Sequence, residues 1–415
     1  MRSLAQEPET RPIVRRLEGS IDLVVDSMKA TKLVGVMGSG LIGADPYAES
    51  AWSGSSKYFF KECERQGLLH RALGVEVEAA RRVPLILRNF SFDRSVWRQK
   101  FYLDTKYYDL LSTRIVRALR ADDRGYPLLQ IGAIYNLKPL LDTGRQVFSY
   151  HDGILAQAVR SPDFTHGVSA SRVQRALDYE ARVYRNIDVI FTMSQYLKDS
   201  FVNDFGIEER RVRTIGAGIN VDSVPPVKED KRYDTKKLLF VGADFERKGG
   251  TDLLRAFKKA RTVHPTAELF IVGPRHLVVP SELSRGVVHS GFLSKKDPAE
   301  AQKFESILND ASLFVMPSHY EPFGIAPLEA MAYQIPAILT DAWAFPEMVT
   351  PGVTGELVKN RDPDDLAEKI VDLLKNPDRL QLMGRAARDL VMRKFTWNAV
   401  VTKLRDELAV LGFAS

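Results

Sequence analysis

The chain has 415 residues, of which 45% are hydrophobic and 27% charged, and its net charge is +6. This length gives room for two ordinary domains, and the composition excludes a disordered or fibrous protein. No apolar stretch is long enough to span a bilayer and the first residues lack a signal-peptide core, so we expect a cytoplasmic protein. The single cysteine, Cys63, excludes an internal disulfide and a multi-cysteine zinc site.

Strands and helices are predicted to alternate through the first half. After a polar arm, a buried strand is expected at residues 32–37, followed by a glycine-rich turn at 38–43. A helix at 57–67, capped by Ser53 or Ser55, comes next. The remaining predictions are strands at 83–87, 128–134, 146–150 and 189–193, with helices at 107–119 and 171–184. This alternation is typical of a doubly wound parallel sheet.

The same alternation begins again after a polar, proline-bearing stretch at 222–235. We therefore predict two Rossmann-like domains, residues 1–214 and residues 215–396. The second is expected to have strands at 237–241, 267–272, 287–289, 313–316 and 337–339, with helices at 251–262, 299–309, 364–375 and 378–393, and a last helix at 397–411.

Two carboxylates lie eight positions apart across a predicted strand-to-helix turn, in the sequence SHYEPFGIAPLEAMA at 318–332. Glu321 precedes a proline and is expected in the loop, whereas Glu329 falls in the first helical turn. Between them, Gly324 allows a ligand to approach the backbone N–H groups at the helix N-terminus, which favour anions. Two carboxylates on either side of unpaired amides could bind the hexose hydroxyls, the phosphate and the ribose hydroxyls of a nucleotide-sugar. The alternative is a loop in which Glu321 caps the helix and Glu329 is solvated.

This run resembles the E-x7-E signature of retaining GT-B glycosyltransferases of the glycosyltransferase 4 family, including its flanking PFG and PLEAM. The resemblance implies an α/β GT-B fold: two Rossmann-like doubly wound domains facing a cleft, with the C-terminal helix crossing back so that 397–415 completes the first domain. It also implies hexose transfer from a UDP- or GDP-linked sugar to an acceptor hydroxyl, with retained anomeric configuration. The leaving phosphate would help to deprotonate the acceptor.

The resemblance assigns roles to the residues of the signature. Glu321 would bind the hexose hydroxyls, and the amides of Phe323, Gly324 and Ile325 would bind hexose and phosphate. Glu329 would hold the ribose.

A second segment, FVGADFERKGG at 240–250, resembles the family's G-R-x-x-x-x-K-G pattern. Lys248 fits the lysine of that pattern, but Ala243 stands where relatives have arginine. Arg247 is the candidate replacement. Two cations at this turn would stabilise the negative charge that builds on a departing diphosphate, although exposed helix-start residues are the alternative.

Further family positions are matched less specifically. Loops at Gly273 and at Phe292 and Leu293 look like those that hold the base. Gly38 and Gly40 resemble the family's N-terminal glycine loop, which implies that they contact the donor. His151 ends a strand where the family often has a histidine near the hexose, with a structural histidine as the alternative. Glu180 and Ser194 also match, but a helix-surface acid and a helix N-cap explain them adequately.

No metal site is predicted. The acidic run at 362–365 looks like the D-x-D motif of another glycosyltransferase fold, but it directly precedes an apolar-periodic helix, so capping by Asp362 is the better explanation. The remaining histidines lack ligand spacing. We expect no cofactor, only a nucleotide-diphosphate sugar as co-substrate.

Positive charge is concentrated in residues 81–124, which hold eleven basic and five acidic residues. This favours an anionic partner, such as a lipid-linked acceptor or a membrane surface, although a solvated helix face is the simpler reading. The amphipathic helix near 107–120 suits either a membrane interface or, as we favour, the core. No nucleic-acid-binding module accompanies the charge.

Two other functional classes remain open. One is a GT-B enzyme of different chemistry, such as a phosphorylase or an epimerase. The other is a non-catalytic protein that binds a nucleotide-sugar or docks on a membrane. We expect a carbohydrate, lipid-linked or small-molecule acceptor for the transferase.

Overall fold

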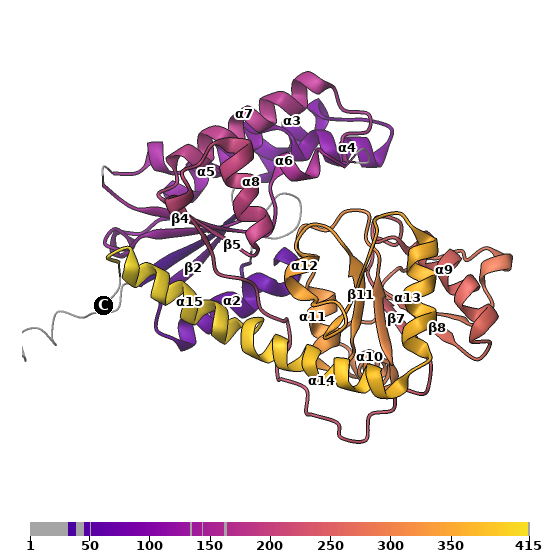
Figure 1. Ribbon diagram of the computed structural model, residues 1–415. Coiled ribbons are helices and arrows are strands. Elements are labelled where there is room, and N and C mark those ends of the chain that lie inside the picture. The colour runs from indigo at the N-terminus through magenta and orange to yellow at the C-terminus, as the bar shows by residue number, and fades with distance from the viewer. Residues whose placement is uncertain are drawn as a thin grey trace, which may run out of the picture.

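The computed structural model describes residues 32–38, 45–49, 51–132, 135–142, 144–161 and 164–413. They form two six-stranded parallel sheets, each packed between helices (Figure 1). The predicted α/β class with two Rossmann-like sheets is confirmed. Gly40, a predicted donor-site residue, lies outside the described residues.

The first sheet has the strand order β2-β1-β3-β4-β5-β6. Helices α2 and α15 cover one face and α5, α7 and α8 the other (Figure 1), which explains the near-continuous apolar runs of its strands. Its elements are β1 (Leu33–Gly38), α2 (Ser55–Arg65), β2 (Leu69–Val75), α3 (Ala79–Arg88), α4 (Arg94–Tyr102), α5 (Thr105–Ala118), β3 (Leu128–Ile131), β4 (Val147–His151), α6 (Leu155–Ala158), α7 (Ala170–Asn186), β5 (Val189–Thr192), α8 (Gln195–Phe205) and β6 (Val212–Thr214).

The second sheet has the strand order β12-β11-β10-β7-β8-β9. The chain moves outward from β7 to β9 and then returns to the other side of β7 as β10, so the strand order reverses between β7 and β10. In open α/β sheets, ligands bind at the carboxyl ends of the strands at such a switch point. The elements are β7 (Lys237–Val241), α9 (Gly250–Val263), β8 (Glu268–Val272), β9 (Val287–Gly291), α10 (Pro298–Asp310), β10 (Leu313–Met316), α11 (Ile325–Ala332), β11 (Ala337–Thr340), α12 (Phe345–Met348), β12 (Gly355–Val358), α13 (Pro363–Leu374), α14 (Pro377–Lys394) and α15 (Trp397–Val410).

The strand predicted at 83–87 is wrong, because this segment lies in α3. Its apolar run VPLIL looks like a buried strand, but only Leu85 is buried, and Val83 and Leu87 are exposed. The edge strand beside β1 is β2, seven residues with a histidine and an arginine among them. The edge strands β6 and β12 are three and four residues long and were not predicted.

The predicted caps of α2 are also wrong. Neither Ser53 nor Ser55 caps the helix; its N-cap is Gly54, whose φ of 88° lies in the left-handed region that glycine tolerates. By contrast, Ser194 caps α8 as predicted, since its hydroxyl accepts the N–H of Leu197 at 3.1 Å.

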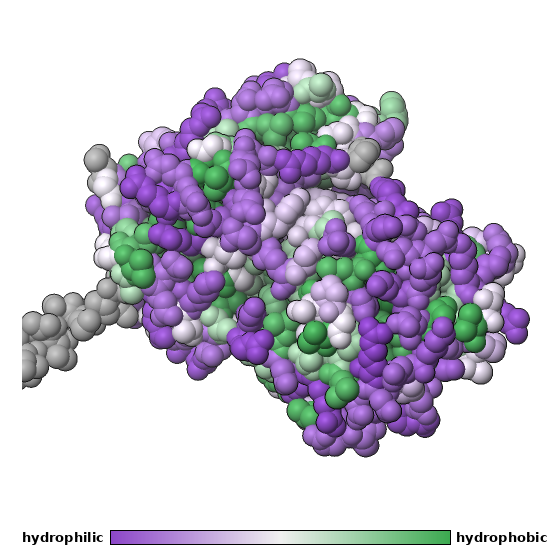
Figure 2. Space-filling view, in the orientation of Figure 1, coloured by the Kyte–Doolittle hydropathy of each residue, from purple (hydrophilic) through white to green (hydrophobic). Residues whose placement is uncertain are grey.

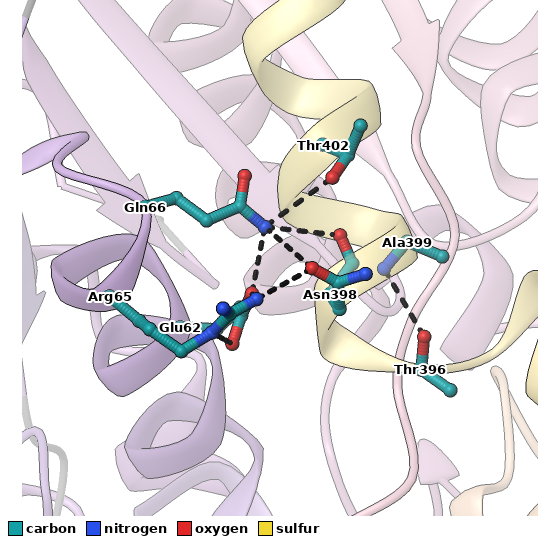
Figure 3. Close-up of polar contacts among 7 residues, drawn as sticks. All are labelled: Glu62, Arg65, Gln66, Thr396, Asn398, Ala399 and Thr402. Atoms are coloured by element: carbon teal, nitrogen blue, oxygen red, sulfur yellow. Dashed lines mark hydrogen bonds and ion pairs between the residues drawn. The ribbon is translucent and has the colours of Figure 1, made fainter.

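Helix α15 crosses back to the first half, as predicted. Figure 3 shows Asn398 of α15 against α2, where its side-chain oxygen accepts from Arg65 at 2.7 Å and from Gln66 at 3.2 Å. The buried Trp397 ring lies 5.8 Å from that of Phe59, and its indole N–H donates to the Asn220 side chain at 3.1 Å. The last helix thus joins both halves to the connecting segment.

Trp397→Ala is expected to lower the free energy of unfolding by about 3–5 kcal/mol, the cost of emptying a buried tryptophan site. Urea denaturation of the variant measures this. Val410→Ala is the control, since that side chain is exposed on the same helix and its loss should change stability by less than about 0.5 kcal/mol. Equal stability of both variants would show that the packing of Trp397 contributes nothing.

Candidate active site

Glu321 lies in the loop that connects β10 to α11, at the switch point of the second sheet. Gly324 ends this loop as the N-cap of α11, with a φ of 93°. A Cβ on Gly324 would lie 2.9 Å from the Phe345 ring and 3.2 Å from Cγ of Glu321, so the turn needs glycine both for its conformation and for space. The predicted strand, turn and helix of the signature are all present.

Glu321 is buried and paired with two cations. Its Oε2 lies 2.9 Å from Nζ of Lys248 and 3.4 Å from Nη1 of Arg247. Burial alone would raise the pKa of this carboxyl, but the two positive charges outweigh it and leave the pKa below its ordinary value. Glu321 is therefore an ionised carboxylate held in a fixed position.

Close backbone packing brings Lys248 to this carboxylate. The Lys248 side chain lies over Gly242, where a Cβ would come within 2.2 Å of its Cδ. At Gly249, whose φ is 73°, a Cβ would lie 2.0 Å from the Pro317 carbonyl oxygen. The loop after β7 therefore rests directly on the loop after β10, and glycine at both positions permits it.

Arg247 is shared among several acceptors. Its guanidinium donates to the Tyr320 carbonyl at 2.7 Å and to the Asp244 carboxylate at 3.1 Å, besides its contact with Glu321. The structure thus brings the predicted pair Arg247 and Lys248 together on Glu321. Arg247 is the more exposed of the two.

Glu329, on α11, forms an ion pair that the sequence did not predict. Its Oε1 lies 3.0 Å from Nζ of Lys295, which also donates to the Asn220 carbonyl at 3.0 Å. Burial raises the pKa of Glu329, against the lowering effect of Lys295. Lys295 lies two residues after the predicted base loop. Its closeness in sequence to that loop is informative only once the fold shows that Lys295 contacts Glu329.

The predicted base loops lie side by side at the ends of β8 and β9. Gly273 donates its N–H to the Gly291 carbonyl at 2.8 Å, and a Cβ on it would lie 2.6 Å from the Gly242 backbone. The Phe292 ring is partly exposed beneath the Arg275 guanidinium, 4.6 Å from the ring centroid, and Leu293 is half-buried. A flat base would have both an aromatic and a cationic surface here.

The first half contributes the loop after β4. His151 is fully buried, packs edge-on against Tyr184 and Phe201, and its Nε2 has no hydrogen-bond partner among the described residues. Burial lowers its pKa to about 3, so the ring is neutral. Gly38, at the end of β1, donates its N–H to the Tyr135 hydroxyl at 3.0 Å and packs against the core.

Asp152 follows His151 and was missed by the sequence reasoning. Burial raises its pKa, the Trp52 indole donates to it, and its charge interacts with that of Glu321. The next residue, Gly153, touches the signature loop: a Cβ on it would lie 2.9 Å from Cβ of Pro322. The loop that follows His151 thus lies against the loop that carries Glu321, across the two halves.

The explanation of Glu180 as a helix-surface acid is wrong, because its side chain is buried. Both carboxyl oxygens lie 3.2 Å from the Leu155 N–H, and burial raises its pKa to about 7. The α7 periodicity did not reveal this, since α5 and α6 cover the helix only in the folded chain. Glu180 therefore changes charge near neutral pH.

Glu180→Gln is expected to stabilise the protein increasingly as pH rises from 4.5 to about 7. The folded wild type binds a proton across this window that the unfolded chain has released, so wild-type stability falls there relative to the neutral variant. The expected difference in unfolding free energy reaches about 2–3 kcal/mol above pH 7. Urea titrations across the pH series measure it, and a difference independent of pH would contradict the assignment.

Asp362 caps α13, accepting the N–H groups of Asp364 and Asp365 at 3.1 and 3.0 Å, as predicted. Among the described residues, one group combines metal-ligand types at close range: His70, Asp122 and Asp123. Arg71 donates to both oxygens of that Asp123, which neutralises it. This group lies in the first half, between β2 and the turn after α5, and outside the cluster around Glu321.

Two family models match consecutive parts of the chain: "Glycosyltransferase Family 4" matches residues 125–223 and "Glycosyl transferases group 1" matches residues 226–390. Among curated relatives, the chain is 29% identical over 239 residues to a glycogen synthase of Mycobacterium tuberculosis, covering 57% of each protein. It is 29% identical over 268 residues to a GDP-mannose-dependent monoacylated alpha-(1-6)-phosphatidylinositol monomannoside mannosyltransferase of Corynebacterium glutamicum, covering 59% of this chain and 68% of that protein. The chain thus spans little more than half the length of the glycogen synthase.

Solved structures resemble the whole fold. Sucrose-phosphate synthase from Thermosynechococcus elongatus superposes with a TM-score of 0.66 at 19% identity, over 92% of this chain and 100% of that one. HepE from Anabaena, in complex with UDP, gives 0.60 at 16% identity, again over 92% and 100%. Together, the family models, the curated relatives and the shared two-sheet architecture show that the chain belongs to the GT4-type glycosyltransferases of the GT-B fold.

Proposed function

We propose that the protein is a retaining glycosyltransferase that moves a hexose from a UDP- or GDP-linked sugar to an acceptor hydroxyl. The observation that carries this proposal is the cluster of the buried Glu321 with Lys248 and Arg247 at the switch point of the second sheet. It combines a fixed carboxylate for sugar hydroxyls with two cations for a diphosphate, beside the N-terminus of α11. That combination suits a sugar joined to a nucleotide through phosphate.

The cations would serve the departing nucleotide. In the proposed reaction, the bond between the anomeric carbon and the diphosphate oxygen breaks, and its electron pair leaves with the phosphate. Lys248 has three N–H donors, so it can keep Glu321 and also bind a phosphate oxygen. Arg247 would add charge from the more exposed side. Fixed cations at the point where negative charge develops lower the barrier without reorganisation.

The acceptor oxygen would bond to the same face of the anomeric carbon that the phosphate leaves, and its proton would pass to a leaving-phosphate oxygen. Glu321 orients the hexose through its hydroxyls, because it is ionised and anchored. His151 is neutral at physiological pH, since its pKa is about 3, so it would not donate a proton as a cation.

Backbone groups and Glu329 would hold the rest of the donor. The amides of Phe323, Gly324 and Ile325 stand at the first turn of α11 and would bind hexose and phosphate oxygens. Glu329 would accept from the ribose hydroxyls with Lys295 beside it. Ribose and pyrophosphate are common to many donors. The protein groups that would bind them therefore do not identify the sugar or the base of the donor.

The identity of the donor and acceptor is best approached through a panel. HepE was solved with UDP, whereas the corynebacterial relative is named as GDP-mannose-dependent, so both nucleotides belong in it. We propose a carbohydrate, lipid-linked or small-molecule acceptor. We also propose that no metal takes part, because Lys248 and Arg247 supply the positive charge that a divalent cation would otherwise bring.

The test is release of nucleoside diphosphate from UDP- and GDP-sugars, with and without a broad acceptor set, in buffer containing EDTA. Turnover with one donor and an α-linked product from an α-linked donor, read by NMR, supports the proposal. Phosphate-dependent release of sugar 1-phosphate would indicate a phosphorylase, and isomerised donor an epimerase. Donor binding without turnover would indicate a non-catalytic protein, and loss of turnover with EDTA would contradict metal independence.

A further inference from the structure

An apolar helix face is exposed at the outer part of the first half. On α3, Ala80, Val83, Pro84 and Leu87 follow one another at helical spacing, as if they faced a core, yet all are exposed. Val83 is 50% exposed and Leu87 is 67% exposed. Helix α5, whose sequence suits either a membrane interface or the core, buries Leu111 and Ile115 and so packs in the core, as expected.

The turn after α3 adds two aromatic side chains. Phe90 is 50% exposed and Phe92 is 99% exposed, and their rings lie 5.2 Å apart. We call the exposed side chains of this region the α3–α4 face: Val83, Leu87, Phe90 and Phe92, with Arg88, Arg94 and Arg98. Figure 2 shows green apolar side chains next to purple ones on the upper part of the molecule, where Figure 1 draws α3 and α7.

Internal contacts hold this turn in shape. Phe90 packs edge-on against Trp97 of α4, with ring centroids 5.6 Å apart, and the Trp97 indole donates to the Ile86 carbonyl at 3.1 Å. Arg172 of α7 donates to the side chain of Asn89 and to the Lys100 carbonyl at 2.9 Å. The exposure of Phe92 is therefore a property of an organised turn.

Positive charge surrounds the exposed rings. Residues 79–102 contain Arg81, Arg82, Arg88, Arg94, Arg98 and Lys100, against Asp93 as the one acidic residue. Asp93 is used as the N-cap of α4, accepting the N–H groups of Ser95 and Val96. Arg88, Arg94 and Arg98 form no ion pair with any other residue that the structure describes.

We propose that the α3–α4 face docks on an anionic lipid surface. Exposed aromatic and aliphatic side chains among unpaired arginines match a bilayer interface, where the apolar groups enter the headgroup region and the arginines meet lipid phosphates. Phe92 projects from a turn, a shape that suits insertion into lipid. None of the described helices is both long and apolar enough to cross a bilayer, so the contact would be peripheral.

The position of the face gives the docking a consequence that rests on the proposed function. Helix α4 runs from the face to Tyr102, which lines a small pocket together with Leu155 and Glu180. Gly153, two residues before Leu155, lies against Pro322 in the loop that carries Glu321. A bilayer on the α3–α4 face would therefore be connected through α4 to the loop after β4, and could present a lipid-linked acceptor to the candidate site.

Vesicle flotation tests the docking without any need for activity. The full chain is expected to float with vesicles of equal parts phosphatidylcholine and phosphatidylglycerol, to float much less with phosphatidylcholine alone, and to be released by raised salt. Phe90→Ser/Phe92→Ser is expected to lower the partition coefficient about tenfold or more. Arg94→Gln/Arg98→Gln is expected to lower it by about tenfold on anionic vesicles only.

Val278→Ser/Leu382→Ser is the matched control, because both side chains are exposed in the second half, and its flotation should equal that of the wild type. Melting temperatures and the thermal shift induced by UDP or GDP confirm that each variant is folded and keeps its donor site. No flotation of the wild type, or unchanged flotation of the Phe90/Phe92 variant, would overturn the proposal. Capture of a protein by this face without vesicle binding would do so as well.

Discussion

Glu321→Gln is expected to lower kcat/KM for nucleoside-diphosphate release by about a thousandfold. The change keeps the size of the side chain but removes the negative charge that pairs with Lys248 and Arg247. The two cations lose their anchor, and the hexose loses a charged acceptor for its hydroxyls. Because the carboxylate is buried, water cannot replace either interaction. Steady-state kinetics with the donor found in the panel measure the loss.

Glu356→Gln provides a matched control in the same half. Glu356 is also buried and also pairs with two cations, Lys369 at 3.3 Å and Arg379 at 2.8 Å, but it lies on β12. Its replacement should destabilise the fold through the same loss of a buried charge pair, with kcat/KM within about threefold of wild type. Comparable loss of activity in both variants would mean that Glu321 acts through stability alone, which would contradict its role in the site.

The sequence predicted both loops of this cluster, but it could not predict their contact. The motif around Glu321 and the segment around Lys248 each have a local pattern of glycines, charges and apolar strands. Their ion pair depends on the return of the chain from β9 to β10, which places two distant strands side by side. Lys295 and Asp152 were missed for the same reason, since each gains its meaning from a neighbour in another part of the chain.

Two of the errors of prediction share one physical cause. Periodicity reports which side chains share a face, but it does not report what covers that face. On α3, an apolar stripe that looked like a buried strand is exposed. On α7, Glu180 looked like a surface acid and is buried. Tertiary packing determines whether each side chain is exposed or buried. The exposed stripe on α3 is part of the face proposed to contact lipid.

Lys248→Met is expected to lower kcat by about a hundredfold or more, and Arg247→Met by about tenfold. Lys248 is the better placed of the two: its side chain is 14% exposed, against 36% for Arg247, and it is closer to Glu321. Arg247 also divides its donors between Asp244 and the Tyr320 carbonyl. Lys259→Met, a change of an exposed lysine on α9, serves as the control and should leave kcat unchanged.

The pH dependence should separate the two variants further. Lys248 lowers the pKa of Glu321 more strongly than Arg247 does, so its removal allows burial to raise that pKa. If the ionised carboxylate binds the sugar, as proposed, the acidic limb of the pH–rate profile should move to higher pH in Lys248→Met and move less in Arg247→Met. A larger shift and a larger loss in Arg247→Met would reverse the assignment, making Arg247 the principal cation of the site despite its greater exposure.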